Sequence, residues 1–185
     1  LIFSKIYQMK TYLNCTFVLI LLYLSCILLF SCSGSKKNLP VISKGTLDLS
    51  NYDFENRSFL RLDGEWEFYE GKFLNSNILK SATIKPDGMI LVPGEWSSFS
   101  SEREVPRAFG YGTYVLHIKG NSVNSLVLKL LYTGTASEIE YLGNIVYRSG
   151  SISSNIENHI PKREPAVIFL SNTPEQFDII IRVSN

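Results

Sequence analysis

The chain has 185 residues, with 18 Lys and Arg against 17 Asp and Glu, and 45% of its residues are hydrophobic. Such a length and composition are those of one modest globular domain. The formal net charge of +1 lacks the positive excess that nucleic-acid-binding and polybasic membrane-surface proteins need, so we expect neither class and no nucleic-acid partner.

All three cysteines, Cys15, Cys26 and Cys32, lie near the N-terminus. Residues after Cys32 therefore cannot form an internal disulfide or a cysteine-ligated zinc site among themselves, and a hydrophobic core must stabilise the domain. The two histidines, His117 and His159, have no cysteine or second histidine close in sequence, so no metal site is expected. The sequence holds no phosphate-binding loop or catalytic-triad motif, and we expect no cofactor.

The N-terminal segment has the order of a secretory signal. The pair Met9-Lys10 supplies a short positive region, an apolar run extends from Phe17 to Phe30, and polar residues follow at 31–37. Because residues 11–35 carry no charge and about 20 apolar residues suffice to cross a bilayer, the segment is also long enough to remain as an uncleaved anchor.

Residues 29–32, Leu-Phe-Ser-Cys, resemble a bacterial lipobox, in which the cysteine becomes the lipidated first residue of the mature protein. Phe30 departs from the small or aliphatic residue that strict lipoboxes carry there. Alternatively, Cys32 is only a small residue near a cleavage site. On either interpretation, residues 1–32 are a signal or anchor, and we predict a domain that is exported and held at a membrane, facing the periplasm or the cell exterior.

Residues 33–44 are polar and contain Pro40, so we expect a tether there and a folded domain over 45–185. The domain shows a period of two, which is typical of half-buried strands. Its clearest strand is expected at 60–68, where one face carries Leu60, Leu62, Gly64, Trp66 and Phe68. Further strands are expected at 114–119, 126–132 and 177–183, with weaker candidates at 45–49, 89–92, 138–142, 145–148 and 166–170.

Little helix is expected, apart from one or two turns at 73–80. Short strands separated by Gly, Pro and other turn residues favour an all-β fold, and we predict an antiparallel β-sandwich, with a jelly roll as its expected form.

Carboxylates cluster around Trp66, and most glycosidases use a pair of carboxyl groups for acid/base or nucleophilic catalysis. However, Asp63, Glu65 and Glu67 alternate with the apolar residues of the strand at 60–68. We therefore expect them on a solvated face, without the burial that gives two carboxylates different roles, and we expect no catalytic residue in this chain.

A long irregular connection extends from Gly94 to Gly110 and mixes aromatic, serine and charged residues. Loops at one end of a sandwich commonly carry its binding function. Trp96, Arg107 and Tyr111 are the candidate ligand-binding residues, since aromatic faces stack on sugars and guanidinium groups bind polar substituents. Alternatively, Trp96 simply plugs the end of the sandwich, as a largely buried residue type.

Four segments occur together in an order that resembles a known family. They are LDGEWEFYEG at Leu62–Gly71, VPGEW at Val92–Trp96, GYGTY at Gly110–Tyr114 and IIIRVSN at Ile179–Asn185. They resemble the extracytoplasmic sensor domain of bacterial seven-transmembrane receptors with diverse intracellular signalling modules, over roughly residues 45–185. A fainter resemblance is to the sugar-binding jelly roll of β-galactosidase and β-glucuronidase type enzymes. Both imply a galactose-binding-like fold.

The resemblance implies an extracytoplasmic ligand-sensing domain of a signal-transduction receptor, of which the membrane spans and the cyclase, kinase or phosphatase output lie outside this chain. The first alternative is a carbohydrate-binding accessory sandwich of a glycoside hydrolase, and the second is a structural envelope lipoprotein. The expected partners are a membrane, through the N-terminal segment, and a small-molecule or carbohydrate ligand.

The family often has an Asn-Gly hairpin turn where this chain has Leu142-Gly143-Asn144, and Gly143-Asn144 is expected to make the turn. The sequence indicates no oligomeric state.

Overall fold

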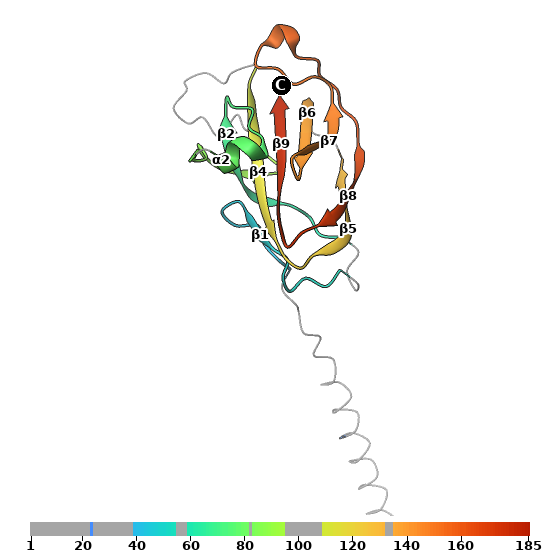
Figure 1. Ribbon diagram of the computed structural model, residues 1–185. Helices are drawn as coiled ribbons and strands as arrows, with labels where there is room; N and C mark the ends of the chain where they lie inside the picture. Colours follow the sequence, from blue (N-terminus) through green and yellow to red (C-terminus); the bar gives the residue numbers. More distant parts are fainter. Residues whose placement is uncertain (1–22, 24–38, 55–58, 82, 95–108, 132–134) are drawn as a thin grey trace, which may run out of the picture. The chain divides into compact units, whose positions relative to one another are not determined.

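A computed structural model describes Tyr23 and residues 39–54, 59–81, 83–94, 109–131 and 135–185 (Figure 1). Cys32, nearly all of the predicted signal or anchor and half of the predicted tether lie outside these residues, so the expectations of export, lipidation and membrane retention stay predictions. Within the described residues, no helix has the length and apolar character needed to cross a membrane.

The described elements are short strands and two short helical segments. In chain order they are β1 (Thr46–Asp48), β2 (Gly64–Glu70), α2 (Ser76–Ser81), β3 (Gly88–Val92), β4 (Tyr111–Lys119), β5 (Val123–Leu130), β6 (Ala136–Tyr141), β7 (Asn144–Ser149), the 3-10 turn η2 (Ile156–Asn158), β8 (Ala166–Thr173) and β9 (Gln176–Ser184).

The strands form two sheets. A seven-stranded sheet has the order β3-β2-β4-β9-β6-β7, with β1 added beside β4, and β5 and β8 make a second, two-stranded sheet (Figure 1). Neighbouring strands are antiparallel except β1 and β4, which are parallel. The predicted class, an all-β antiparallel sandwich with little helix, is confirmed.

The hydrophobic core lies between the two sheets. Trp66 of β2, Leu116 of β4 and Ile179 of β9 are buried in one cluster with Ile168 and Leu170 of β8. The expected inward face of β2 is confirmed, because Trp66 is only 3% exposed. Its indole Nε1–H donates a hydrogen bond of 3.0 Å to the carbonyl oxygen of Leu62, so burial leaves no unpaired polar group on the ring.

The strand expected at 60–68 begins only at Gly64, although Leu60 and Leu62 still pack partly buried against the core. Gly64 has a φ of +149° and pairs with Ile42 through a parallel bridge. A Cβ on Gly64 would lie 2.6 Å from Cβ of Ile42, so only glycine lets the two segments approach this closely.

The segment before β1 also belongs to the core. Ile42 lies in the stretch expected to be a tether, yet it is 4% exposed and packs in the main cluster. The compact unit begins at Leu39 rather than at Gly45.

The outer face of the large sheet is covered in part by α2 and the segments that flank it (Figure 1). Tyr69 of β2, Leu74, Val115 of β4 and Ile180 of β9 form a second buried cluster there, with Leu79 of α2 against it. Both faces of β4 are therefore buried over part of its length, which the alternation of Tyr114 to Lys119 did not predict.

The hairpin between β6 and β7 turns one residue earlier than expected. Leu142 and Gly143 are its two central residues, with φ values of 47° and 80°, and Tyr141 pairs with Asn144. Positive φ at both central positions is typical of the hairpin turn whose twist matches that of the strands. The expected hairpin is confirmed, with Leu142-Gly143 rather than Gly143-Asn144 at the turn.

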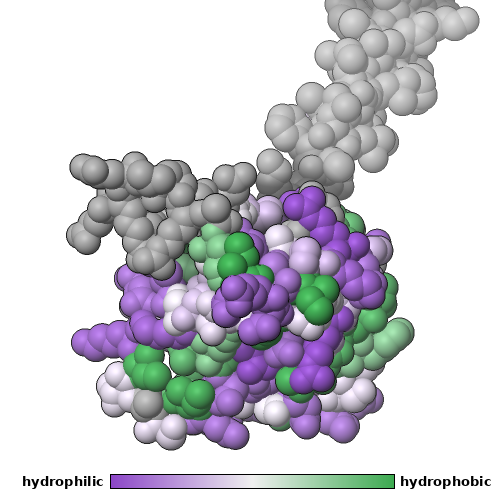
Figure 2. Space-filling view, turned by 90° about the horizontal axis from the view of Figure 1, so that it is seen from above, coloured by the Kyte–Doolittle hydropathy of each residue, from purple (hydrophilic) through white to green (hydrophobic). Residues whose placement is uncertain are grey.

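Exposed large hydrophobic side chains are present on both sheets. On the face of the molecule seen in Figure 2, hydrophobic residues form separate groups among hydrophilic ones. The aromatic ring of Phe169 on β8, which is 73% exposed, is one of the most exposed of these side chains.

Candidate functional site

The residues predicted to bind ligand are only partly described. Trp96 and Arg107 lie outside the described residues, so their role stays a prediction. Tyr111 is the first residue of β4, half-buried, and its ring lies 4.9 Å from that of Phe73, centroid to centroid.

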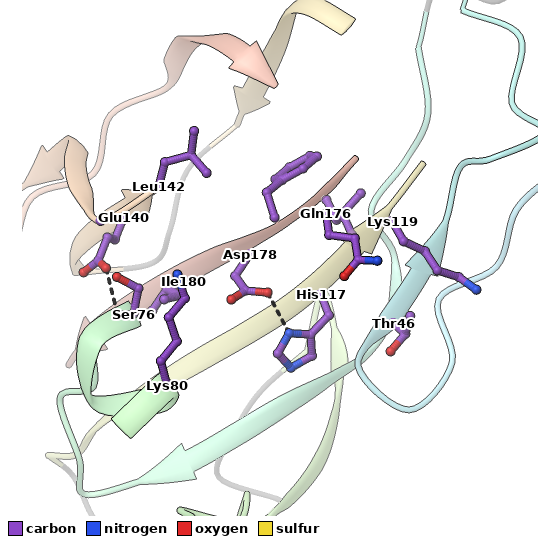
Figure 3. A pocket seen from close by; sticks show the side chains of 13 residues that line it. Thr46, Ser76, Lys80, His117, Lys119, Glu140, Leu142, Gln176, Asp178 and Ile180 are labelled. Carbon is purple, nitrogen blue, oxygen red and sulfur yellow. Dashed lines mark hydrogen bonds and ion pairs between the residues drawn. The ribbon is translucent and has the colours of Figure 1, made fainter. Parts of the chain in front are cut away.

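A hollow of about 510 Å³ opens on the outer face of the large sheet, beside α2 (Figure 3). This volume lies within the range of about 300 to 1,000 Å³ that is common for small-molecule sites. Strands β1, β4, β6 and β9, helix α2 and the β6–β7 turn all contribute to its wall. Its lining residues are Thr46, Ser76, Lys80, His117, Ile118, Lys119, Glu140, Leu142, Gly143, Gln176, Phe177, Asp178 and Ile180.

His117 lies between two carboxylates at one side of the hollow. Its Nδ1 is 2.7 Å from Oδ1 of Asp178, and its Nε2 is 3.4 Å from Oε2 of Glu67. The antiparallel register of β4 and β9 places His117 directly opposite Asp178, so the sheet itself sets this contact. The hydroxyl of Tyr69 donates a hydrogen bond of 2.8 Å to the same Glu67 oxygen.

The electrostatics of this group follow from the neighbouring carboxylates. The hydrogen bond to Asp178 is the largest effect that raises the pKa of His117, with Glu67 adding to it, whereas partial burial opposes the increase. Burial and the Glu67 carboxylate raise the pKa of Tyr69, so the phenol stays protonated as a donor.

A second polar cluster includes Glu140, one of the lining residues. Oε1 of Glu140 accepts a hydrogen bond of 2.8 Å from the backbone N–H of Ser76, which fixes the start of α2 to the sheet (Figure 3). Arg182 of β9 is 11% exposed, and its Nη2 lies 3.4 Å from Oε2 of Glu140 and 3.3 Å from Oε2 of Glu138. Arg148 also pairs with Glu138, at 2.8 Å. The two carboxylates are thus matched by two guanidinium groups.

Among the polar side chains of the wall, Lys80 and Gln176 remain available to a ligand. Lys80, in the last turn of α2, reaches into the hollow (Figure 3), and Gln176 stands at the start of β9. Neither side chain makes a hydrogen bond or ion pair with any residue that the structure describes. Apolar surface is also present, from the exposed side chain of Leu142. The described residues contain no group of three His, Cys, Asp or Glu side chains that could hold a metal ion.

The structure corrects one expectation about this region. Glu67 does not stand on a solvated strand face, because its side chain is 17% exposed and bound by Tyr69 and His117. The reason is that α2 and its flanking segments cover the outer face beside it, which strand alternation alone does not reveal.

Sequence reasoning did not identify the hollow. One signal was present, since His117 and Asp178 each interrupt an otherwise apolar strand at an outward-facing position. Their proximity depends on the register between β4 and β9, which the spacing of the strands did not fix.

The raised pKa of His117 predicts a pH-dependent stability. Because the folded state holds its proton more tightly than the unfolded state, the stabilising contribution is fully present below about pH 6.5 and is lost as pH rises through the higher folded-state pKa. The side chain is 42% exposed, so we expect a loss of no more than about 1 kcal/mol. Urea unfolding of the whole chain between pH 5.5 and pH 9 measures it.

His117→Gln supplies the control, because glutamine does not titrate in this range. The difference in unfolding free energy between the wild-type chain and this variant should be largest near pH 5.5 and shrink as pH rises. A difference that is constant with pH would contradict the assigned ion pairs.

No protein-family model and no curated protein sequence matches this chain. Among solved structures, a Faecalibacterium prausnitzii β-glucuronidase is similar to 66% of this chain, at 16% identity and a TM-score of 0.46. A β-glucuronidase from Ruminococcus gnavus, in complex with uronic deoxynojirimycin, is similar over 67% at 13% identity, with a TM-score of 0.47. A β-galacturonidase of glycoside hydrolase family 2 from Eisenbergiella tayi, bound to galacturonate, is similar over 68% at 14% identity, with a TM-score of 0.40. The similar part is 20%, 21% and 20% of these three chains, about one fifth of their length.

Proposed function

We propose that the β-sandwich is a non-catalytic module that binds a small carbohydrate in the hollow on the outer face of its large sheet. The observation that carries the proposal is the hollow itself, of about 510 Å³, with polar side chains held in place by the sheet register and by α2. In this role the chain corresponds to an accessory sandwich of a glycoside hydrolase, the first of the alternatives predicted from the sequence.

The wall suits a molecule with hydroxyl groups and C–H faces. Asp178 accepts hydrogen bonds, Lys80 donates them and the amide of Gln176 does both, whereas the exposed side chain of Leu142 offers apolar contact. A site with a few convergent polar groups on an apolar surface gives orientation and specificity to a small ligand.

The proposal assigns binding rather than hydrolysis because of how the lining carboxylates are paired. A glycosidase needs a protonated carboxyl group as acid and a second carboxylate as base or nucleophile. Asp178 is paired with His117, and Glu140 is held by Ser76 and Arg182. Both lining carboxylates are thus engaged by other groups of the protein.

Ligand sensing in a signal-transduction receptor is the second candidate. The observation that favours it is the set of four segments, from Leu62–Gly71 to Ile179–Asn185, that resembles the receptor sensor domain. The two candidates differ in what the gene encodes after Asn185, since a receptor continues into membrane spans and a hydrolase into a catalytic barrel. Sequencing the reading frame beyond Asn185 distinguishes them.

The binding site is tested by titrating the whole chain, in detergent micelles, with a panel of neutral and acidic monosaccharides by calorimetry. We expect Asp178→Asn to weaken the binding of any sugar that is found by about tenfold, which is the effect of losing one charge-assisted hydrogen bond. Asp63→Asn is the matched control, because Asp63 is exposed, pairs with Arg61 and lies outside the hollow.

The same titration tests the loop predicted from the sequence. If Trp96→Ala, Arg107→Ala or Tyr111→Ala weakens binding while Asp178→Asn does not, the ligand binds at the loop and the hollow is not the site. If no monosaccharide binds at millimolar concentration, the carbohydrate-binding proposal is wrong.

A further inference from the structure

The charges around the hollow are unevenly matched. Lys119 is paired with Asp48 at 2.8 Å, on the rim. Asp178 and Glu140, the lining carboxylates, already have partners in His117 and in Arg182. Lys119 and Glu140 therefore each have an ion-pair partner of opposite charge, and Asp178 has a histidine partner that is positive when protonated.

Lys80 is different. It projects from the last turn of α2 into the hollow (Figure 3), and no carboxylate of the described residues pairs with its ammonium group. The backbone of α2 is fixed at its other end, where the N–H of Ser76 donates to Glu140. The anchored helix thus holds a cation beside a space large enough for a ligand.

We infer that the ligand of the hollow is an acidic sugar, a hexuronate, whose carboxylate pairs with Lys80. The inference rests on the proposed carbohydrate-binding function and names its substrate class. An ammonium group brings three donors and one positive charge, which match the single negative charge of a carboxylate. The hydroxyl groups of the sugar then face Gln176 and Asp178 across the hollow.

His117, Asp178 and Glu67 form a trio of ionisable side chains at the side of the hollow where β4 pairs with β9. With His117 protonated, Glu67 and Asp178 leave that trio with one net negative charge. Glu67 does not line the hollow, and its carboxylate accepts from the hydroxyl of Tyr69. Among the described lining residues, Lys80 is the charged side chain that has no ion-pair partner.

The test compares three sugars of the same shape that differ at C6, in calorimetric titrations of the whole chain in detergent micelles. The probes are D-glucuronate, D-glucuronamide and D-glucose, with the matching galacturonate, galacturonamide and galactose as a second series. We expect the uronate to bind about two to five times more tightly than the amide, as for a partly exposed ion pair. This ratio should fall when sodium chloride is raised to about 1 M, where screening shortens to about 3 Å.

Lys80→Gln should remove the difference between uronate and amide, because glutamine keeps a hydrogen-bond donor at this position but carries no charge. Lys85→Gln is the matched control, because Lys85 is also exposed but does not line the hollow. If Lys80→Gln leaves the preference intact, or if Lys85→Gln removes it equally, Lys80 does not select the ligand.

The two proposals fail in different ways. If glucose and galactose bind as tightly as their uronates, the hollow is a sugar site and the inference of an acidic ligand is overturned. If none of the six sugars binds, the carbohydrate-binding function and the acidic ligand are both overturned.

Discussion

Trp66→Ala should lower the free energy of unfolding by about 3 to 5 kcal/mol. The indole is 3% exposed in the main core cluster, so truncation leaves a large cavity between the sheets and removes the hydrogen bond to Leu62. Such a loss is a large part of the roughly 5 to 15 kcal/mol that stabilises a typical domain. Urea unfolding followed by circular dichroism at pH 7 measures it.

Phe169→Ala is the matched control, because it removes an aromatic ring that is 73% exposed on β8. It should change the unfolding free energy by less than about 0.5 kcal/mol. Equal losses from the two variants would mean that Trp66 does not face the space between the sheets.

Arg182→Met should be of comparable severity, costing about 3 to 5 kcal/mol of unfolding free energy. The guanidinium group lies within 3.4 Å of carboxylate oxygens of both Glu138 and Glu140, and Glu140 is 3% exposed. Removing the cation leaves the buried Glu140 carboxylate with no compensating positive charge. The variant should therefore express poorly or unfold at low urea concentration.

Two further variants make the electrostatic origin of this loss testable. Arg61→Met removes an exposed guanidinium paired with Asp63 and should cost less than about 1 kcal/mol. Adding Glu140→Gln to Arg182→Met should recover part of the stability, because the uncompensated charge is then gone. Glu140→Gln alone completes the comparison. If the loss of unfolding free energy in the double variant equals the sum of the losses in Arg182→Met and Glu140→Gln, packing rather than charge explains the effect.

Most strands could be predicted from the sequence because they bury one face. Apolar and polar residues then alternate along the strand, with a period of two. β2 and β9 were found in this way, from the alternation around Trp66 and Ile179. The parallel pairing of β1 with β4 was not predicted, because three residues carry too short a pattern to reveal their partner.

The outer face of the sheet was harder to predict for a physical reason. A strand covered on both faces, such as β4, shows no contrast between buried and exposed positions, so Val115 and His117 looked equally exposed in the sequence. Whether such a position holds a core residue or a binding residue depends on the segment that packs over it. Here α2 and its flanking residues cover Val115 and leave His117 in a hollow.

The route of the chain into the sandwich couples its N-terminal end mechanically to the hollow. Ile42 is embedded in the core, and from there the backbone enters β1, which is hydrogen-bonded along β4. The N–H of His117 itself donates to the carbonyl oxygen of Gly45, at 2.8 Å. A pull applied at Leu39 is therefore borne by Ile42 and then by hydrogen bonds to the strand that carries His117, so tension on this end loads the wall of the hollow directly.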